Sequence, residues 1–134
     1  MLSFIFGILH KNKLKNFMMK KRIIRLVKAA RHSFDGLRSA FASEAAFRQE
    51  LLLFIVCVPI AFVLDVSNLK RILMIGSLFL VLTVEIINTA FETTIDRISS
   101  KQHALSKKVK DLGSAAVFLS LINALIIWVI ILAN

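Results

Sequence analysis

The sequence predicts an all-α integral membrane protein with three transmembrane helices, preceded by an amphipathic helix on the membrane surface. Three observations predict it. Of the 134 residues, 57% are hydrophobic, which is more apolar than the composition of an ordinary soluble domain. Three long apolar runs follow one basic segment with a helical pattern. The Lys and Arg residues are also clustered, with 11 of 18 before residue 51 and five between residues 97 and 110.

The charge distribution indicates how the chain lies in the membrane. A net charge of +10 is typical of nucleic-acid binding, but here the basic residues flank apolar runs and few aromatic residues lie among them. We therefore expect no nucleic-acid partner and a cytoplasmic membrane face instead. Positive loops stay inside, so the N-terminus is expected in the cytoplasm and the C-terminus outside. The expected location is the cell inner (cytoplasmic) membrane.

Residues 1–20 form a basic N-terminal extension. An apolar stretch precedes its lysines, which reverses the order of a secretory signal peptide. We therefore interpret it as a flexible or membrane-touching segment, and Met18 or Met19 is an alternative start of translation. From residue 21 onward, apolar residues recur every three or four positions: Ile23, Val27, Ala30, Phe34, Leu37 and Phe41. Cations occupy another face, as in a helix lying on a bilayer.

Residues 21–134 are expected to form one membrane-embedded domain, with spans at about 46–65, 72–92 and 113–133. The first span contains Pro59, which membrane helices tolerate better than soluble ones. A short external loop, Asp65 to Arg71, leads to the second span. The third span carries Trp128 near its external end, where it could serve as an interface anchor. The lone cysteine, Cys57, lies in an apolar run and is interpreted as a small hydrophobic residue.

Polar residues follow the apolar part of the second span at helical spacing. Glu85, Asn88, Glu92 and Asp96 are separated by three, four and four positions and share an arc of roughly 80°. A carboxylate at the bilayer centre costs about 2.5–3.5 kcal/mol, so such residues usually face protein or water and have a function. The alternative is a helix that simply leaves the membrane, and this explanation is weakest for Glu85.

The depth of this stripe favours phosphoryl transfer to a lipid. Glu85 lies about 20 Å along the axis from the start of the span and Glu92 about 30 Å, near the cytoplasmic boundary. There a lipid hydroxyl could meet a phosphate donor. Carboxylates can hold Mg²⁺ together with nucleotide phosphates, and the deepest one, Glu85, is suited to act as a general base. No glycine-rich phosphate loop is present, so Lys107, Lys108 and Lys110 would supply positive charge, although a role in topology remains equally open.

Three segments carry a family resemblance: Glu44-Ala-Ala-Phe-Arg-Gln-Glu50, Glu85-Ile-Ile-Asn-Thr-Ala-Phe-Glu-Thr-Thr-Ile-Asp-Arg97 and Lys110-Asp-Leu-Gly-Ser-Ala-Ala116. From about Arg22 to the C-terminus, the chain resembles the small prokaryotic diacylglycerol kinases. The resemblance implies transfer of the γ-phosphoryl group of ATP to the primary hydroxyl of diacylglycerol, which gives phosphatidic acid. It also implies a homotrimer with sites between subunits.

The resemblance implies roles for individual residues as well. Glu85 would accept the proton, Asn88 would orient polar groups, and Glu44 and Glu92 would bind Mg²⁺. The residues that would approach ATP are Arg25, His32, Glu44, Glu92, Asp96, His103, Lys110 and Asp111. Those that would contact the lipid are Ala46, Arg48, Glu50, Glu85, Ser114 and Trp128. At His32 the family commonly has an aromatic residue such as Tyr, so this chain departs from the pattern there.

Three other functions remain open at this point. The related undecaprenol kinases apply the same chemistry to a polyprenol, but the stretch from Ala45 to Glu50 looks more like the diacylglycerol enzymes. Aligned carboxylates within a membrane also occur in small ion or proton transporters. A non-catalytic bundle could use buried polar residues only to hold its helices together.

Overall fold

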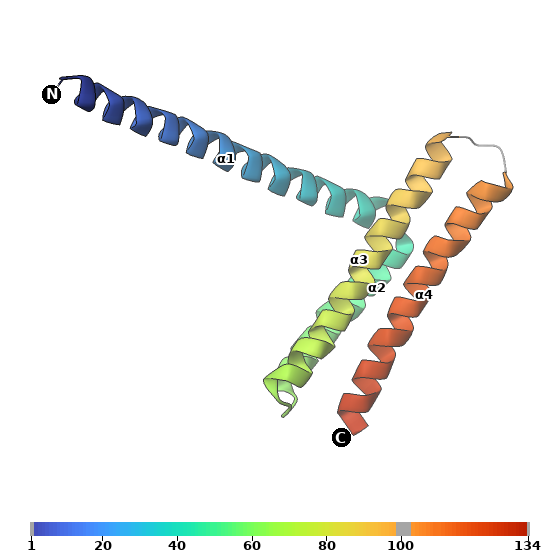
Figure 1. The fold of residues 1–134 in the computed structure, drawn as a ribbon. Coiled ribbons are helices and arrows are strands. Elements are labelled where there is room, and N and C mark those ends of the chain that lie inside the picture. Colours follow the sequence, from blue (N-terminus) through green and yellow to red (C-terminus); the bar gives the residue numbers. More distant parts are fainter. Residues whose placement is uncertain (1, 99–102, 134) are drawn as a thin grey trace. The chain divides into compact units, whose positions relative to one another are not determined.

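The computed structural model describes residues 2–98 and 103–133, with side chains from residue 17 onward. Within these ranges the chain forms four helices: α1 (Leu2–Ser43), α2 (Ala45–Val63), α3 (Asn68–Ile98) and α4 (Ala104–Ala133) (Figure 1). The described residues contain no β-strand, so the all-α fold class is confirmed. The chain divides into two compact units, Met1–Ser39 and Ala40–Asn134.

The first unit is a single long helix. Helix α1 begins at Leu2 and includes the rest of the segment expected to form the N-terminal extension, residues 1–20. Its Lys, Leu and Met residues favour helix, and no proline interrupts them. From residue 20 onward, the apolar side chains Ile23 and Phe34 and the cations Lys21 and Lys28 are all exposed within this unit. The apolar side chains of residues 1–9, expected to touch the membrane, lie outside the described side chains.

The second unit contains three helices that are long and apolar enough to cross a membrane. The chain is therefore a multi-pass membrane protein. Helix α3 has 31 residues and so extends about 46 Å, well beyond a hydrocarbon layer of about 30 Å. Helix α4 begins at Ala104, so Lys107 to Asp111 belong to a helix and not to the loop that we expected. The sequence has no Pro or Gly between Ala104 and Asp111 that would prevent a helix there.

Helix α3 packs against both α2 and α4. Near the α2–α3 turn, Ala61, Met74 and Ile131 form a buried cluster with one residue from each helix. Closer to the other end, Phe47 and Leu82 are buried together with Ala40. Helix α3 thus has two neighbours, so its inner face is the place where a polar side chain can be shielded from lipid.

Polarity is inverted relative to a soluble protein. Large apolar side chains cover the outside of α2, α3 and α4, whereas the buried side chains include the polar residues Glu50, Ser77, Glu85, Asn88 and Ser120. The Ser77 and Ser120 hydroxyls donate to carbonyls of their own helices at 2.7 Å, which satisfies them locally. Glu50 and Glu85 are buried as well, and Glu50 Oε2 has no hydrogen-bond partner among the described residues, which makes the two glutamates candidates for function.

The α2–α3 turn is held by Arg71. Its guanidinium donates to the Ala61 carbonyl at 2.9 Å, the Leu64 carbonyl at 3.2 Å and the Asn68 side-chain oxygen at 3.0 Å. The two carbonyls lie at the C-terminal end of α2, where backbone acceptors lack partners within the helix. Arg71 therefore caps α2 and joins it to the first turn of α3.

Candidate active site

The inner face of α3 carries the expected polar stripe. Its buried residues Met74, Ser77, Val81, Glu85 and Asn88 follow one another at intervals of three or four. Glu85 is 4% exposed and Asn88 is 8% exposed, whereas Glu92 is half-buried and Asp96 is exposed. Exposure thus increases along the stripe toward the C-terminal end of α3, as expected for a stripe that leads from the hydrocarbon to the aqueous rim.

Four carboxylates gather around this stripe. Glu85 lies close enough to Glu92 and Glu44 to be repelled by their charges, and Glu50 interacts with Glu85 in the same way. Glu50 is 8% exposed, and its Oε2 is buried without a hydrogen-bond partner in the described part of the chain. The resemblance implies that Glu50 and Glu85 both contact the lipid; the structure buries both side chains within range of each other's charge.

Glu44 occupies the corner between α1 and α2. It is the one residue between the two helices, its backbone is extended (φ −104°, ψ 118°), and its side chain makes no capping hydrogen bond to α2. The Arg48 guanidinium supports this corner by donating to the Phe41 carbonyl at 2.9 Å and the Ala42 carbonyl at 3.3 Å. The Glu44 carboxylate is thus not engaged in a helix cap, and its charge acts on Glu85.

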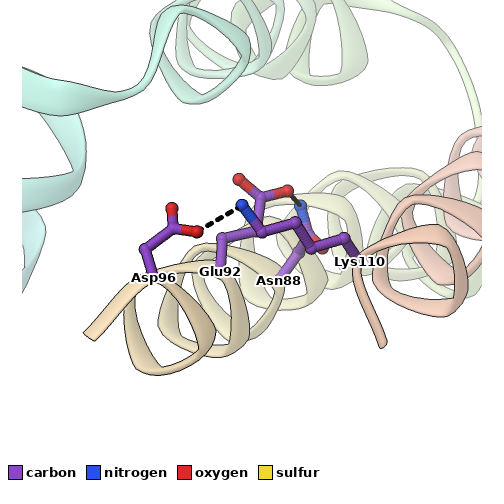
Figure 2. Close-up of polar contacts among 4 residues, drawn as sticks. All are labelled: Asn88, Glu92, Asp96 and Lys110. Atoms are coloured by element: carbon purple, nitrogen blue, oxygen red, sulfur yellow. Dashed lines mark hydrogen bonds and ion pairs between the residues drawn. The ribbon is translucent and has the colours of Figure 1, made fainter. Parts of the chain in front are cut away.

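Helix α4 adds a cation to the stripe. Lys110 Nζ lies 2.5 Å from Asp96 Oδ1, and Asn88 Nδ2 donates to Glu92 Oε1 at 3.1 Å (Figure 2). The negative charge of Glu92 also attracts the Lys110 ammonium group. These contacts combine one amide, two carboxylates and one ammonium group at the C-terminal end of α3, which is a suitable set for binding a phosphate together with a cation.

Four other residues were expected near the nucleotide. Two of them have partners on or next to α4, and two belong to the first unit. Asp111 pairs with Lys107 at 2.7 Å on the exposed face of α4. His103 precedes α4, and its Nδ1 accepts from the Leu105 N–H at 3.2 Å, so the ring caps the helix. Arg25 and His32 are exposed on α1 in the first unit.

The residues expected to contact lipid differ in how exposed they are. Ala46, Arg48 and Ser114 are exposed. Trp128 is half-buried, and its indole N–H donates to the Met74 carbonyl at 3.2 Å. This hydrogen bond joins α4 to α3.

Gly113 is the site residue that sequence reasoning missed. It is buried in α4, and a Cβ at this position would overlap the side-chain oxygen of Asn88. The sequence predicts no role for Gly113 beyond its place in the segment Lys110 to Ala116. Its signal in the sequence was a glycine inside an otherwise good helix, where it lowers helix stability relative to alanine.

The carboxylates suit a cation that arrives with a nucleotide. Among the described residues, no group of three or more His, Cys, Asp or Glu side chains converges to hold a metal ion. Mg²⁺ is commonly bound through one or two carboxylates, with phosphate oxygens and water completing its shell. Glu44 and Glu92 fit that mode, since both lie near Glu85 and neither is fully buried.

Comparison with known proteins agrees with this geometry. The family model for prokaryotic diacylglycerol kinase matches residues 31–132. The diacylglycerol kinase of Escherichia coli K12 is 50% identical over 108 residues, which cover 81% of this chain and 88% of that protein. The Pseudomonas aeruginosa enzyme is 48% identical over the same shares, and the Helicobacter pylori 26695 enzyme is 40% identical over 78% of this chain and 81% of its own length. The chain therefore belongs to the prokaryotic diacylglycerol kinase family.

Proposed function

We propose that the chain is a lipid kinase that transfers the γ-phosphoryl group of ATP to the primary hydroxyl of diacylglycerol, giving phosphatidic acid. The observation that carries this proposal is the buried Glu85, surrounded by other carboxylates on a helix that crosses the membrane boundary. Family membership supports the choice of diacylglycerol, because the relatives are named diacylglycerol kinases.

Glu85 is the proposed general base. It is shielded from water on the inner face of α3, at a depth that a diglyceride hydroxyl can reach. A carboxylate there would accept the proton of the hydroxyl as its oxygen attacks the γ-phosphorus, while the bond from that phosphorus to the bridging oxygen of ADP breaks.

Glu44 and Glu92 are the proposed Mg²⁺ ligands. The ion would neutralise phosphate charge, as cations do in other phosphoryl-transfer enzymes. Asn88 would keep Glu92 oriented through its hydrogen bond at 3.1 Å. Lys110, held by Asp96, would attract the polyphosphate, and Asp111, His103, Arg25 and His32 are proposed to line the path of the nucleotide.

The lipid is proposed to enter between apolar helix faces. Ala46 and Arg48 are exposed in the first turn of α2, Ser114 is exposed on α4, and Glu50 lies within range of the charge of Glu85. Trp128 would line the acyl region deeper in the membrane. We further propose a homotrimer in the inner membrane with the N-terminus inside and the C-terminus outside, in keeping with the many exposed apolar side chains and the clustered cations.

A direct test is phosphorylation with radiolabelled ATP in detergent micelles that contain diacylglycerol, a polyprenol or neither. Label is expected in phosphatidic acid, and it should disappear when EDTA removes Mg²⁺ and return when Mg²⁺ is restored. A clear preference for the polyprenol would overturn the choice of substrate. Ion flux in vesicles without phosphorylation of any lipid would overturn the proposal that the chain is a kinase.

A further inference from the structure

Gly113 is the one described glycine at which a neighbouring side chain leaves no space for a Cβ. Around Gly36 and Gly76, a Cβ would find nothing within 4 Å. At residue 113 it would overlap Asn88 Oδ1 and come within 3.2 Å of Asn88 Cγ. Alanine would favour the helix at all three positions, but only at residue 113 does the neighbouring helix forbid it.

The contact determines how the Asn88 amide lies. Asn88 Oδ1 is buried and has no conventional hydrogen-bond partner among the described residues, and it lies in the direction in which a Gly113 side chain would project. A glycine Cα–H pointing along that direction is a weak donor, of the kind found where helices approach closely. With the oxygen against α4, the other arm of the amide, Nδ2, is turned to Glu92 Oε1 at 3.1 Å (Figure 2).

The same close approach brings Lys110 to the stripe. Lys110 lies one turn before Gly113 on α4, and its ammonium group reaches Asp96 on α3. If α4 were pushed away by even a methyl group, both the Asn88 amide and the Lys110 ammonium group would move relative to Glu92. Cores do not absorb such volume changes without displacement.

We propose that Gly113 is a positioning residue of the active site, which sets the orientation of the Asn88 amide and, through it, of the Glu92 carboxylate. This inference rests on the proposed function for its catalytic consequence. It does not rest on that function for the contact itself, which the structure places between α3 and α4.

The first experiment compares Gly113→Ala with the control Gly76→Ala in the full-length protein. Gly113→Ala is expected to lower turnover at least tenfold and to raise the Mg²⁺ concentration for half-maximal activity several-fold, while KM for diacylglycerol changes less than twofold. It should also lower the midpoint of thermal unfolding. Gly76→Ala should leave all three kinetic quantities unchanged, because its Cβ enters open space. A Gly113→Ala protein that matches the wild type in turnover would overturn the proposal.

The second experiment asks whether Gly113 acts through Asn88. Asn88→Ala removes the side chain that the new methyl group would strike, so the double variant Asn88→Ala/Gly113→Ala should unfold at the same temperature as Asn88→Ala alone and have the same residual turnover. Additive losses in unfolding temperature would mean that Gly113 acts elsewhere, and would overturn the proposal. Because unfolding needs no substrate, this cycle separates failure of the contact from failure of the proposed function, which would appear as no lipid phosphorylation by the wild type.

Discussion

A carboxylate buried against apolar helices is unfavourable, since a charged group at the membrane centre costs about 2.5–3.5 kcal/mol on the gentler scale. The chain buries two such residues, Glu50 and Glu85, whose charges also repel each other. Burial within the packed helices shields them from lipid, but Glu50 Oε2 has no hydrogen-bond partner among the described residues. At the scale of single residues, the presence of this buried pair is best explained by a functional role that lowers stability.

Glu50→Gln tests that trade-off. Neutralising Glu50 removes a desolvated charge and its repulsion of Glu85, so the variant should be more stable to unfolding by about 1 kcal/mol. Its KM for diacylglycerol should rise, because Glu50 is proposed to contact the lipid. Denaturation in mixed micelles and a lipid titration measure the two effects. A destabilised variant would indicate that Glu50 has a compensating partner.

Some residues of the site could be predicted from sequence and others could not. Helical spacing was enough to place Glu85, Asn88 and Glu92 on one face, because that depends only on the period of the helix. The proximity of Glu50 and the contact of Gly113 depend on how α2 and α4 pack against α3, and periodicity within one helix carries no information about its neighbours.

At the scale of elements, the length of α3 is what brings the stripe to the membrane boundary. A helix of 31 residues spans the hydrocarbon and continues into the aqueous rim. The apolar runs predicted the three crossing helices, but they could not predict how far α4 extends. Basic residues near an apolar run can belong either to a loop or to a helix end, and at Lys107 to Asp111 the helix is what forms.

Arg71 tests how the α2–α3 turn is held. Arg71→Gln removes charge-assisted hydrogen bonds to two carbonyls at the end of α2, so the protein should lose about 1–3 kcal/mol of stability. Lys70→Gln is the matched control, since it neutralises the adjacent cation and leaves those bonds in place. Unfolding in mixed micelles measures both. Equal losses in the two variants would show that the charge of the turn matters rather than the cap.

The basic segment Lys20 to Arg22 of α1 makes an independent prediction. Lys20, Lys21 and Arg22 are exposed, and each cation near an anionic membrane surface contributes about 1 kcal/mol of attraction. Replacing all three with Gln should weaken the stimulation of activity by anionic phospholipid several-fold and leave activity in zwitterionic vesicles unchanged. If the triple substitution changes activity equally in both vesicle types, the segment Lys20 to Arg22 does not act through lipid charge.

At the scale of the whole molecule, the membrane unit is an inverted fold, with apolar side chains outside and acidic ones within. The fold class follows from composition and from the three apolar runs. Its proposed enzymatic use depends on the few buried polar residues that the helices bring together. Folding and catalysis can therefore be separated at a residue such as Glu85, whereas a substitution at Gly113 is expected to affect both.

The substitution Glu85→Gln separates effects on catalysis from effects on folding most directly. Glutamine keeps the size and hydrogen-bonding capacity of the side chain but removes the basic carboxylate. Turnover of diacylglycerol should fall at least about 100-fold, the range expected for loss of a general base, while helix content and oligomer size stay the same. Turnover equal to that of the wild type in a correctly folded variant would contradict the central claim.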